Sequence, residues 1–222
     1  MSITGEAGAP QKVGVAITDL LTGVYAVAAI EAALLARART GEGAFIDMAL
    51  LDVQVAMLAN QAMNYLASGT VPAAMGSAHP NIVPYQPFAA KGGAVMIAAG
   101  TDAQFRALCA VLDAPDLAGD ARFAANAGRV AAREDLVPAL AVKIAQHERA
   151  PLLAALEAAG VPAGPVNDIA QVFADPQVAH RAMQMDTGLR TPIMMDGVPA
   201  AASRPAPKAG EHTDEILREL DL

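Results

Sequence analysis

Cysteine and positive charge are both scarce in this sequence, and each scarcity removes a class of function. Cys109 is the one cysteine among 222 residues. A disulfide framework and a zinc site built on cysteines are therefore excluded, and a reducing compartment fits best. The chain has 15 basic and 23 acidic residues, which gives a net charge of −8. This charge repels the phosphates of nucleic acids and the headgroups of anionic membranes, so we expect neither kind of partner.

Long uncharged runs are missing as well. The apolar stretch from 13 to 36 is interrupted by Asp19 and Glu31, so no uncharged run approaches the roughly 18 residues of a membrane-spanning helix. No basic segment with a short apolar core opens the chain, so no export signal is expected, and the protein should be soluble and cytoplasmic. Since 54% of the residues are hydrophobic and 17% are charged, the chain is not a disordered tail. Its length suffices for one large domain with a sizeable core.

Common catalytic motifs are absent too. The sequence has no Walker A loop, no G-x-G-x-x-G and no G-x-S-x-G. Its histidines lack the spacing of metal ligands, so we expect no metal site. Cys109 lies among Leu108, Val111 and Leu112, which indicates a core position rather than a nucleophile. The four histidines are His79, His147, His180 and His212.

Hydrophobic periodicity and helix-ending residues predict a mostly helical chain with one hairpin. The helix expected over 19–39 is apolar nearly all round, so other parts of the protein should enclose it. Lys91-Gly92-Gly93 between two apolar runs is typical of a hairpin, with strands at 88–90 and 94–98. Beyond 183 the chain should be extended and interrupted by prolines. Further helices are predicted over 50–66, 102–112, 129–146, 151–160, 169–181 (broken at Asp175-Pro176) and 213–220.

The stretch from 68 to 87 contains glycines and prolines that prevent regular structure, so it should form a loop about 20 residues long. Loops of this length in compact chains are commonly functional or disordered, and the apolar side chains here favour an ordered loop. Residues 76–81 and 84–86 place polar side chains on backbone that a ligand can approach. An ordinary surface loop is the alternative. Asp102 suits the capping position of a helix better than the role of a catalytic acid.

Several segments, taken together and in order, resemble the family III CoA-transferases, also called the CaiB/BaiF family. Each segment alone is a weak signal, but their order along nearly the entire chain is specific. The matching text is MSITGE at 1–6, KVGVA at 12–16, DL at 19–20, TG at 22–23, TGEG at 40–43, ID at 46–47, LLD at 50–52, HPNIVPYQ at 79–86, GVPAGPV at 160–166, DPQ at 175–177 and GEHT at 210–213.

The resemblance implies a fold and a domain organisation. Members have an α/β fold, in which a Rossmann-like large domain binds CoA and a small α+β domain is mostly helical. By this resemblance, residues 1–70 are a large-domain remnant with linker helices, and 71–183 are the small domain with its hairpin and helices. Residues 184–222 are an extended return to the large domain with a C-terminal helix. Because subunits of the family form interlocked dimers, the resemblance also implies a homodimer or a companion chain that carries the N-terminal half.

The resemblance implies a reaction as well. Family members move CoA from an acyl-CoA thioester to a carboxylic acid through an aspartyl intermediate, with both compounds as substrates and no tightly bound cofactor. The aspartate nucleophile precedes the stretch that matches 1–5. It should therefore lie outside this chain, which we expect to be a C-terminal portion that is inactive alone. No aspartate here matches the nucleophile's motif, so no catalytic residue is assigned, and the residues that bind CoA are unknown.

The position of the 76–86 segment implies the substrate contacts. It matches the glycine-rich loop that covers the reacting aspartate in formyl-CoA transferase, although His-Pro-Asn-Ile replaces the glycines and Pro80 makes the loop stiffer. The expected substrate-binding residues are His79, Asn81, Tyr85 and Gln86.

Two other interpretations stay open. The alpha-methylacyl-CoA racemases of the same superfamily place an acidic residue just before a Gln-Phe pair, and Asp102 lies just before Gln104-Phe105. The local sequence is nevertheless more similar to the transferase branch. The second alternative is a truncated, non-catalytic structural fragment.

Overall fold

The computed structural model describes residues 1–186, 188–200 and 205–221. Helices and short antiparallel sheets are mixed along the chain, as expected for an α/β fold class. Contacts between residues divide the chain into two units, Met1–Pro165 and Val166–Leu222. The domain boundaries expected at 70/71 and 183/184 concern the whole protein and stay predictions.

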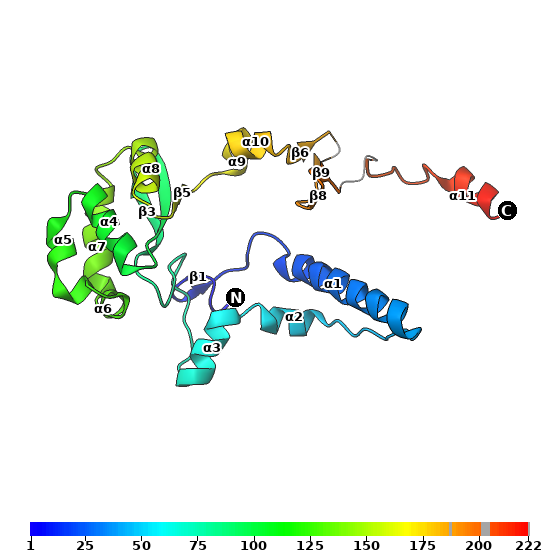
Figure 1. The fold of residues 1–222 in the computed structure, drawn as a ribbon, viewed down its shortest axis with the longest axis horizontal. Coiled ribbons are helices and arrows are strands. Elements are labelled where there is room, and N and C mark those ends of the chain that lie inside the picture. Colours follow the sequence, from blue (N-terminus) through cyan, green and yellow to red (C-terminus); the bar gives the residue numbers. More distant parts are fainter. Residues whose placement is uncertain (187, 201–204, 222) are drawn as a thin grey trace. The chain divides into compact units, whose positions relative to one another are not determined.

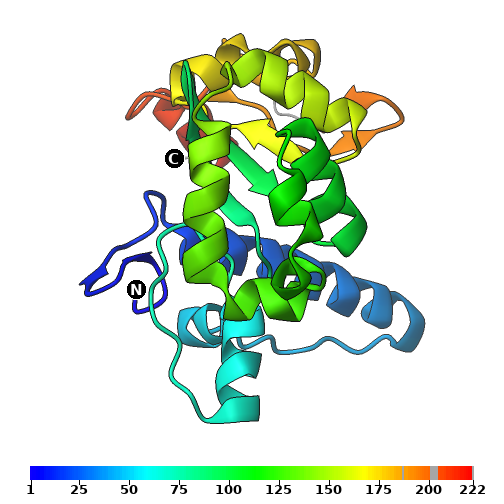
Figure 2. The same cartoon turned by 90° about the vertical axis from the view of Figure 1, so that its left-hand side faces the viewer.

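A three-stranded antiparallel sheet organises the first unit. β3 (Tyr85–Ala90) and β4 (Gly93–Ala98) form a hairpin, and β5 (Ala163–Pro165) pairs with the other edge of β4. The predicted hairpin is confirmed, and Gly92 at its turn has a φ of 81°, which glycine adopts without strain. One face of this sheet is covered by helices α4 (Asp102–Val111), α7 (Arg133–Ile144) and α8 (Arg149–Ala158), as Figures 1 and 2 show.

The hydrophobic core lies between this sheet and its helices, and its buried residues run from Val83 to Val161. Val95 and Ile97 are two residues apart on β4, so both side chains face the helices. Leu136 and Leu140, four residues apart on α7, are both fully buried, as expected for one face of a helix. Each such side chain contributes about 1.5–3 kcal/mol by its removal from water. This core gives the first unit a rigid frame.

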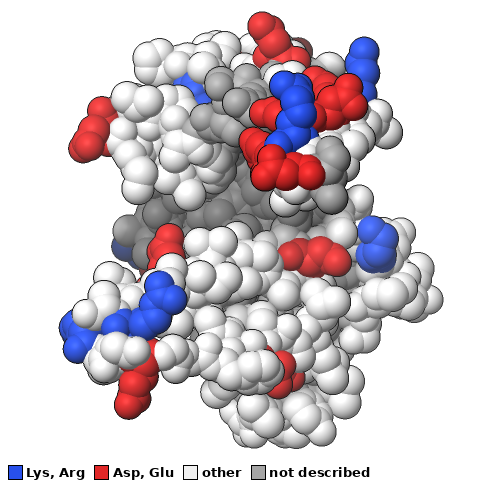
Figure 3. Space-filling model, turned by 90° about the vertical axis from the view of Figure 1, so that its right-hand side faces the viewer, with Lys and Arg blue, Asp and Glu red and all other residues white. Residues whose placement is uncertain are grey.

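Helix α1 (Ile17–Thr40) has no buried residue, although its sequence is almost wholly apolar. The expectation that protein encloses this helix is therefore not met within the described chain. On the face drawn in Figure 3 the lower part is mostly white, with few acidic or basic side chains, whereas such side chains gather near the top. By length and composition α1 could cross a membrane, with a mean hydropathy of 1.6 over 18 residues. Core helices of soluble proteins pass the same test, so this property does not by itself indicate a membrane protein.

Two predicted helices are each divided in two. The helix expected over 50–66 forms α2 (Leu50–Ala56) and α3 (Ala59–Ser68), because Ala59, the first residue of α3, adopts a left-handed φ of 45°. The helix expected over 129–146 forms α6 (Asn126–Ala131) and α7, which are separated by a turn at Ala132. No glycine or proline marks either break, so the sequence carries no signal for it.

The capping residue of helix α4 lies one residue earlier than predicted. Thr101, not Asp102, is the capping residue, and it forms a reciprocal capping box with Gln104. Asp102 is the first helical residue. The remaining elements of the first unit are β1 (Gly5–Glu6), β2 (Ala9–Pro10), α5 (Pro115–Gly119) and a 3-10 turn at Ala121–Phe123.

In the described part of the second unit all helices and strands are short. The predicted break at Asp175-Pro176 is confirmed, because Asp175 caps a new helix there with its carboxylate. Arg190 is buried and donates two hydrogen bonds to the carbonyl of Arg181. The elements are α9 (Ile169–Ala174), α10 (Pro176–His180), β6 (Gln184–Met185), β7 (Gly188–Leu189), β8 (Met194–Met195), β9 (Val198–Pro199) and α11 (Thr213–Glu219).

The contrast between core and α1 predicts a contrast in stability. Replacing the fully buried Leu140 by alanine should lower the free energy of unfolding by about 3 kcal/mol, because it opens a cavity in the core. The matched change Leu35→Ala on α1, where the side chain is 67% exposed, should alter it by less than about 0.5 kcal/mol. Urea denaturation of both variants measures the difference. A large cost for Leu35→Ala would mean that α1 is covered in solution.

Cys109 should behave as a core residue. Burial, reinforced by Asp116, raises the pKa of its thiol to about 11. We expect no reaction with a thiol reagent at neutral pH until the protein is unfolded. Because the folded thiol keeps a proton that the unfolded chain loses, the free energy of unfolding should fall as the pH rises from about 9 to about 11. In a Cys109→Ala variant this part of the pH dependence should disappear.

Candidate functional site

The 76–86 segment is an ordered loop that is anchored at both ends. At its start, the Gly76 N–H donates to the carbonyl of Gly5, 2.8 Å away. A side chain at Gly76 would collide with the Glu6 carboxylate, since a Cβ would lie 2.7 Å from its Oε1. At its end, the loop enters β3 at Tyr85, whose carbonyl accepts a hydrogen bond of 2.9 Å from the His79 N–H. The loop between His79 and Tyr85 is therefore closed on itself.

His79 and Tyr85 form an aromatic stack beside this closure. Their ring centroids are 5.2 Å apart and their planes differ by 8°. The Asn81 backbone N–H donates to His79 Nδ1 at 3.1 Å. In the neutral ring Nδ1 is therefore the acceptor and Nε2 carries the proton. His79 thus has one orientation, and its N–H donor is at Nε2.

Asn81 is paired with an asparagine of α3. Asn64 Nδ2 donates to Asn81 Oδ1 at 3.0 Å, and Asn81 Nδ2 donates back to Asn64 Oδ1 at 3.1 Å. Each amide group has two N–H donors and an oxygen with two lone pairs. One N–H and one lone pair of Asn81 therefore remain for another contact, and the residue is exposed.

Gln86 lies apart from the other three expected residues. It follows Tyr85 on β3, so the two side chains point to opposite faces of the sheet. Gln86 is opposite Ile97, which faces the helices, whereas Tyr85 is opposite Ala98. The loop therefore brings together His79, Asn81 and Tyr85, and Gln86 is on the helix-covered face.

Three side chains that the sequence analysis missed hold the backbone of this loop. Asn126 Nδ2 donates to the Asn81 carbonyl at 2.8 Å, and Arg129 Nε donates to the Val83 carbonyl at 2.8 Å. Arg133 Nη2 donates to the carbonyls of His79, at 2.6 Å, and Pro80, at 3.1 Å. The three donors are three and four residues apart, so the sequence did contain a signal in the form N-x-x-R-x-x-x-R.

Asn126 and Arg129 also connect the loop to the core. The Val83 N–H donates to Asn126 Oδ1 at 3.2 Å, which makes the Asn126 contact reciprocal. Arg129 is 0% exposed, and its guanidinium lies 4.7 Å from the centre of the Phe105 ring. Its Nη1 donates to the carbonyl of Phe123 at 3.0 Å. A buried arginine thus links the loop to α4 and α6.

The buried charge of Arg129 is balanced by Asp102. Arg129 Nη2 lies 2.9 Å from Asp102 Oδ1, although the pair lacks the geometry of an aligned hydrogen bond. The Asp102 side chain is partly exposed, so water screens this pair. Asp102 is therefore the counter-ion of an arginine in the core.

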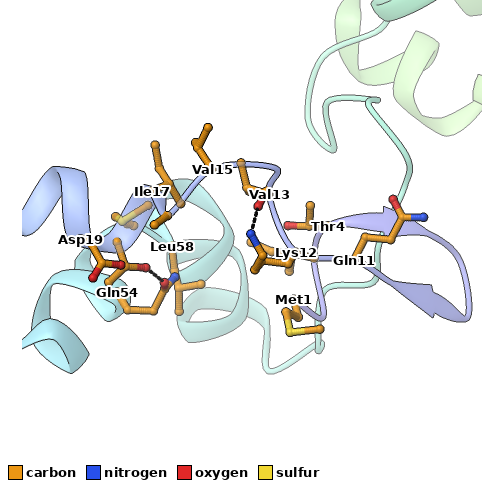
Figure 4. A pocket seen from close by; sticks show the side chains of 14 residues that line it. Met1, Thr4, Gln11, Lys12, Val13, Val15, Ile17, Asp19, Gln54 and Leu58 are labelled. Carbon is orange, nitrogen blue, oxygen red and sulfur yellow. Dashed lines mark hydrogen bonds between the residues drawn. The ribbon is translucent and has the colours of Figure 1, made fainter.

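The N-terminal segment and α2 enclose a different pocket, with a volume of about 490 Å³ (Figure 4). Its cation, the Lys12 ammonium, donates to the Val13 carbonyl at 2.7 Å, and Thr18 donates to Gln54. Lys12 therefore bonds to a backbone carbonyl of its own segment, and Thr18 bonds to a side chain of α2. Among the described residues, no group of histidine, cysteine, aspartate and glutamate side chains could hold a metal ion.

Comparison with known proteins gives a consistent result. The model of the family described as "CoA-transferase family III" matches residues 1–213. The succinate–glutarate CoA-transferase of Agrobacterium fabrum is 47% identical over 231 aligned positions, which cover 100% of this chain and 58% of that protein. The mouse succinyl-CoA:glutarate CoA-transferase is 41% identical, with 99% and 53% covered. This chain thus spans little more than half the length of these relatives.

Solved structures agree with the sequence comparison. A crystal structure of a CAIB/BAIF family protein from Brucella suis matches with a TM-score of 0.81 and 50% identity, covering 100% of this chain and 60% of that one. The Rv3272 protein of Mycobacterium tuberculosis matches with a TM-score of 0.80 and 28% identity, covering 95% and 57%.

The role of Arg129 can be tested by its removal. Arg129→Met should lower the free energy of unfolding by about 3 kcal/mol, because it leaves the carbonyls of Val83 and Phe123 without their donors in a dry interior. The matched variant Arg122→Met removes an arginine whose side chain is 57% exposed and pairs with surface carboxylates. That change should cost much less, because water screens an exposed ion pair. Urea denaturation compares the two, and equal costs would contradict the linking role of Arg129.

Proposed function

Because the chain belongs to CoA-transferase family III, we propose that it is part of an enzyme that moves coenzyme A from an acyl-CoA thioester to a carboxylic acid. The chain covers only 58% of its Agrobacterium relative, so this activity is proposed for the whole protein and not for these 222 residues alone. The observation that carries the proposal within this chain is the loop at His79. It presents oriented N–H donors, which are the groups that a carboxylate needs.

The acceptor is proposed to be a small dicarboxylic acid. Two of the relatives are named for transfer between succinate or succinyl-CoA and glutarate. The loop suits an anion because His79 has its proton at Nε2 and Asn81 has one amide N–H to spare. Tyr85 keeps the His79 ring in place by stacking. Gln86 stays a predicted contact, and it would need a substrate that reaches the other face of the strand.

The proposed chemistry divides one difficult exchange into easier steps. An aspartate carboxylate attacks the thioester carbonyl, which releases CoA thiolate and forms a mixed anhydride. The thiolate then attacks the aspartyl carbonyl, which releases the donor acid and leaves an aspartyl thioester. The acceptor carboxylate attacks this thioester, which frees the thiolate again and forms a second anhydride. The thiolate attacks the acceptor's carbonyl, which gives the new acyl-CoA and restores the aspartate.

In this scheme the nucleophile is contributed from outside these 222 residues. Asp102 is the counter-ion of Arg129, which gives it a structural role instead of a nucleophilic one and offers no support for racemase chemistry. His79 and Asn81 would bind the acceptor carboxylate through their N–H donors and hold it in position for the reaction. CoA takes part as a substrate and not as a resident cofactor. We also propose a cytoplasmic enzyme that is completed by a second copy or by a companion segment.

Reconstitution tests the proposed function. The chain should be combined with the part of the Agrobacterium relative that it does not match, and transfer of CoA from succinyl-CoA to glutarate should be measured by chromatography. We expect transfer by the combination and none by the chain alone. His79→Ala should raise the KM for glutarate about tenfold through loss of a charged hydrogen bond, whereas His180→Ala on α10 should leave it unchanged. Transfer by the chain alone, or an unchanged KM in His79→Ala, would refute the proposal.

A further inference from the structure

We propose that Arg133 is a positioning residue for the acceptor acid, which rests on the proposed function of the 76–86 loop. Arg133 does not act on the acid directly. Its Nη2 bonds to the carbonyls of His79 and Pro80, at 2.6 and 3.1 Å, and so fixes the peptide groups on either side of Pro80. The orientation of His79 and Asn81, the two expected acid contacts, follows from these peptide groups.

The environment of Arg133 distinguishes it from an ordinary surface arginine. Burial lowers the pKa of its guanidinium from the usual range. Within the described part of the chain it forms no ion pair, and its Nη1 is buried without a hydrogen-bond partner. A buried donor without a partner costs free energy, so the two carbonyl contacts are the compensation for placing the charge here. Holding the loop in one conformation gives a reason for placing Arg133 here in spite of this cost.

The role of Arg133 differs from the roles of Asn126 and Arg129, the other two residues in the stripe of donors that holds the loop. Arg129 reaches Val83 and belongs to the core, so its loss affects the fold. Asn126 holds the backbone between Asn81 and Val83. Arg133 alone of the three binds the carbonyl of His79 itself. Its removal should therefore loosen the part of the loop around His79 and leave the part around Val83 in place.

Acid binding should depend on this arrangement. A hydrogen-bond donor held in one orientation binds an anion without first losing conformational freedom. When His79 and Asn81 are released, each substrate molecule must order them again. The effect should fall on the KM for the acid more than on kcat, because the loop contacts the acid before and during the reaction alike.

Hydrogen exchange measured by NMR on the 222-residue chain tests whether Arg133 orders the loop, and it requires no catalysis. In Arg133→Met the amides of His79 and Asn81, which are bonded to Tyr85 and to the His79 ring, should exchange about tenfold faster. The Val83 amide, which is bonded to Asn126, should change by less than about threefold. Arg133→Lys keeps the charge and one donor, so it should restore part of the protection. The control Arg122→Met should leave all three amides unchanged.

Kinetics on the reconstituted enzyme test whether the ordered loop contributes to binding of the acid. Arg133→Met should raise the KM for glutarate about tenfold, with kcat within about twofold, and Arg133→Lys should recover part of the loss. Unchanged exchange at His79 and Asn81 would overturn the proposal whatever the kinetics are. Faster exchange with an unchanged KM would overturn the link to the acid. If the unmodified combination transfers no CoA, the proposed function fails and so does the acid-binding role, while exchange still decides whether Arg133 holds the loop.

Discussion

Irregular backbone must have partners for its carbonyl groups, and the loop beside His79 obtains them from side chains. Four of its carbonyls, those of His79, Pro80, Asn81 and Val83, accept hydrogen bonds from Asn126, Arg129 and Arg133. Sheets and helices satisfy such groups internally, whereas a loop of this kind depends on external donors. The shape of the candidate site therefore depends on one stripe of α6 and α7, and that stripe is held in place by the core packed against the sheet.

The fold was predictable where local signals are strong. Gly92 and Gly93 between apolar runs identified the hairpin, and Asp175-Pro176 identified a helix break, because each acts through its own backbone preferences. The breaks at Ala59 and Ala132 could not be found in this way. Alanine is a strong helix former, so the local sequence gives no sign of either break. The cap of α4 was expected at Asp102, but the residue that caps the helix is its neighbour Thr101.

The position of the loop that carries the candidate site was predictable, but the contacts that hold the loop were not. A polar, proline-containing sequence pointed to the loop with His79, Asn81 and Tyr85, and the first two stand in direct contact through Asn81 N–H and His79 Nδ1. Gln86 is adjacent in sequence, yet strand alternation turns it to the opposite face. Asn64, Asn126 and Arg133 are 17 to 54 residues away from their partners in the loop, so only the folded chain reveals them. The spacing N-x-x-R-x-x-x-R groups Asn126 with Arg133, but it does not indicate which backbone they contact.

The two arginines of this stripe also bring positive charge close to the loop. The chain as a whole carries a charge of −8, which disfavours anions at a distance. Behind the loop, however, the Arg129 charge is balanced by a partly exposed Asp102, and Arg133 has no carboxylate partner among the described residues. A cation in a poorly solvated position acts on nearby charges more strongly than one in water. The arginine that orders the loop therefore also makes the electrostatic potential around the loop more positive, so a single side chain sets both the geometry and the local potential of the candidate site.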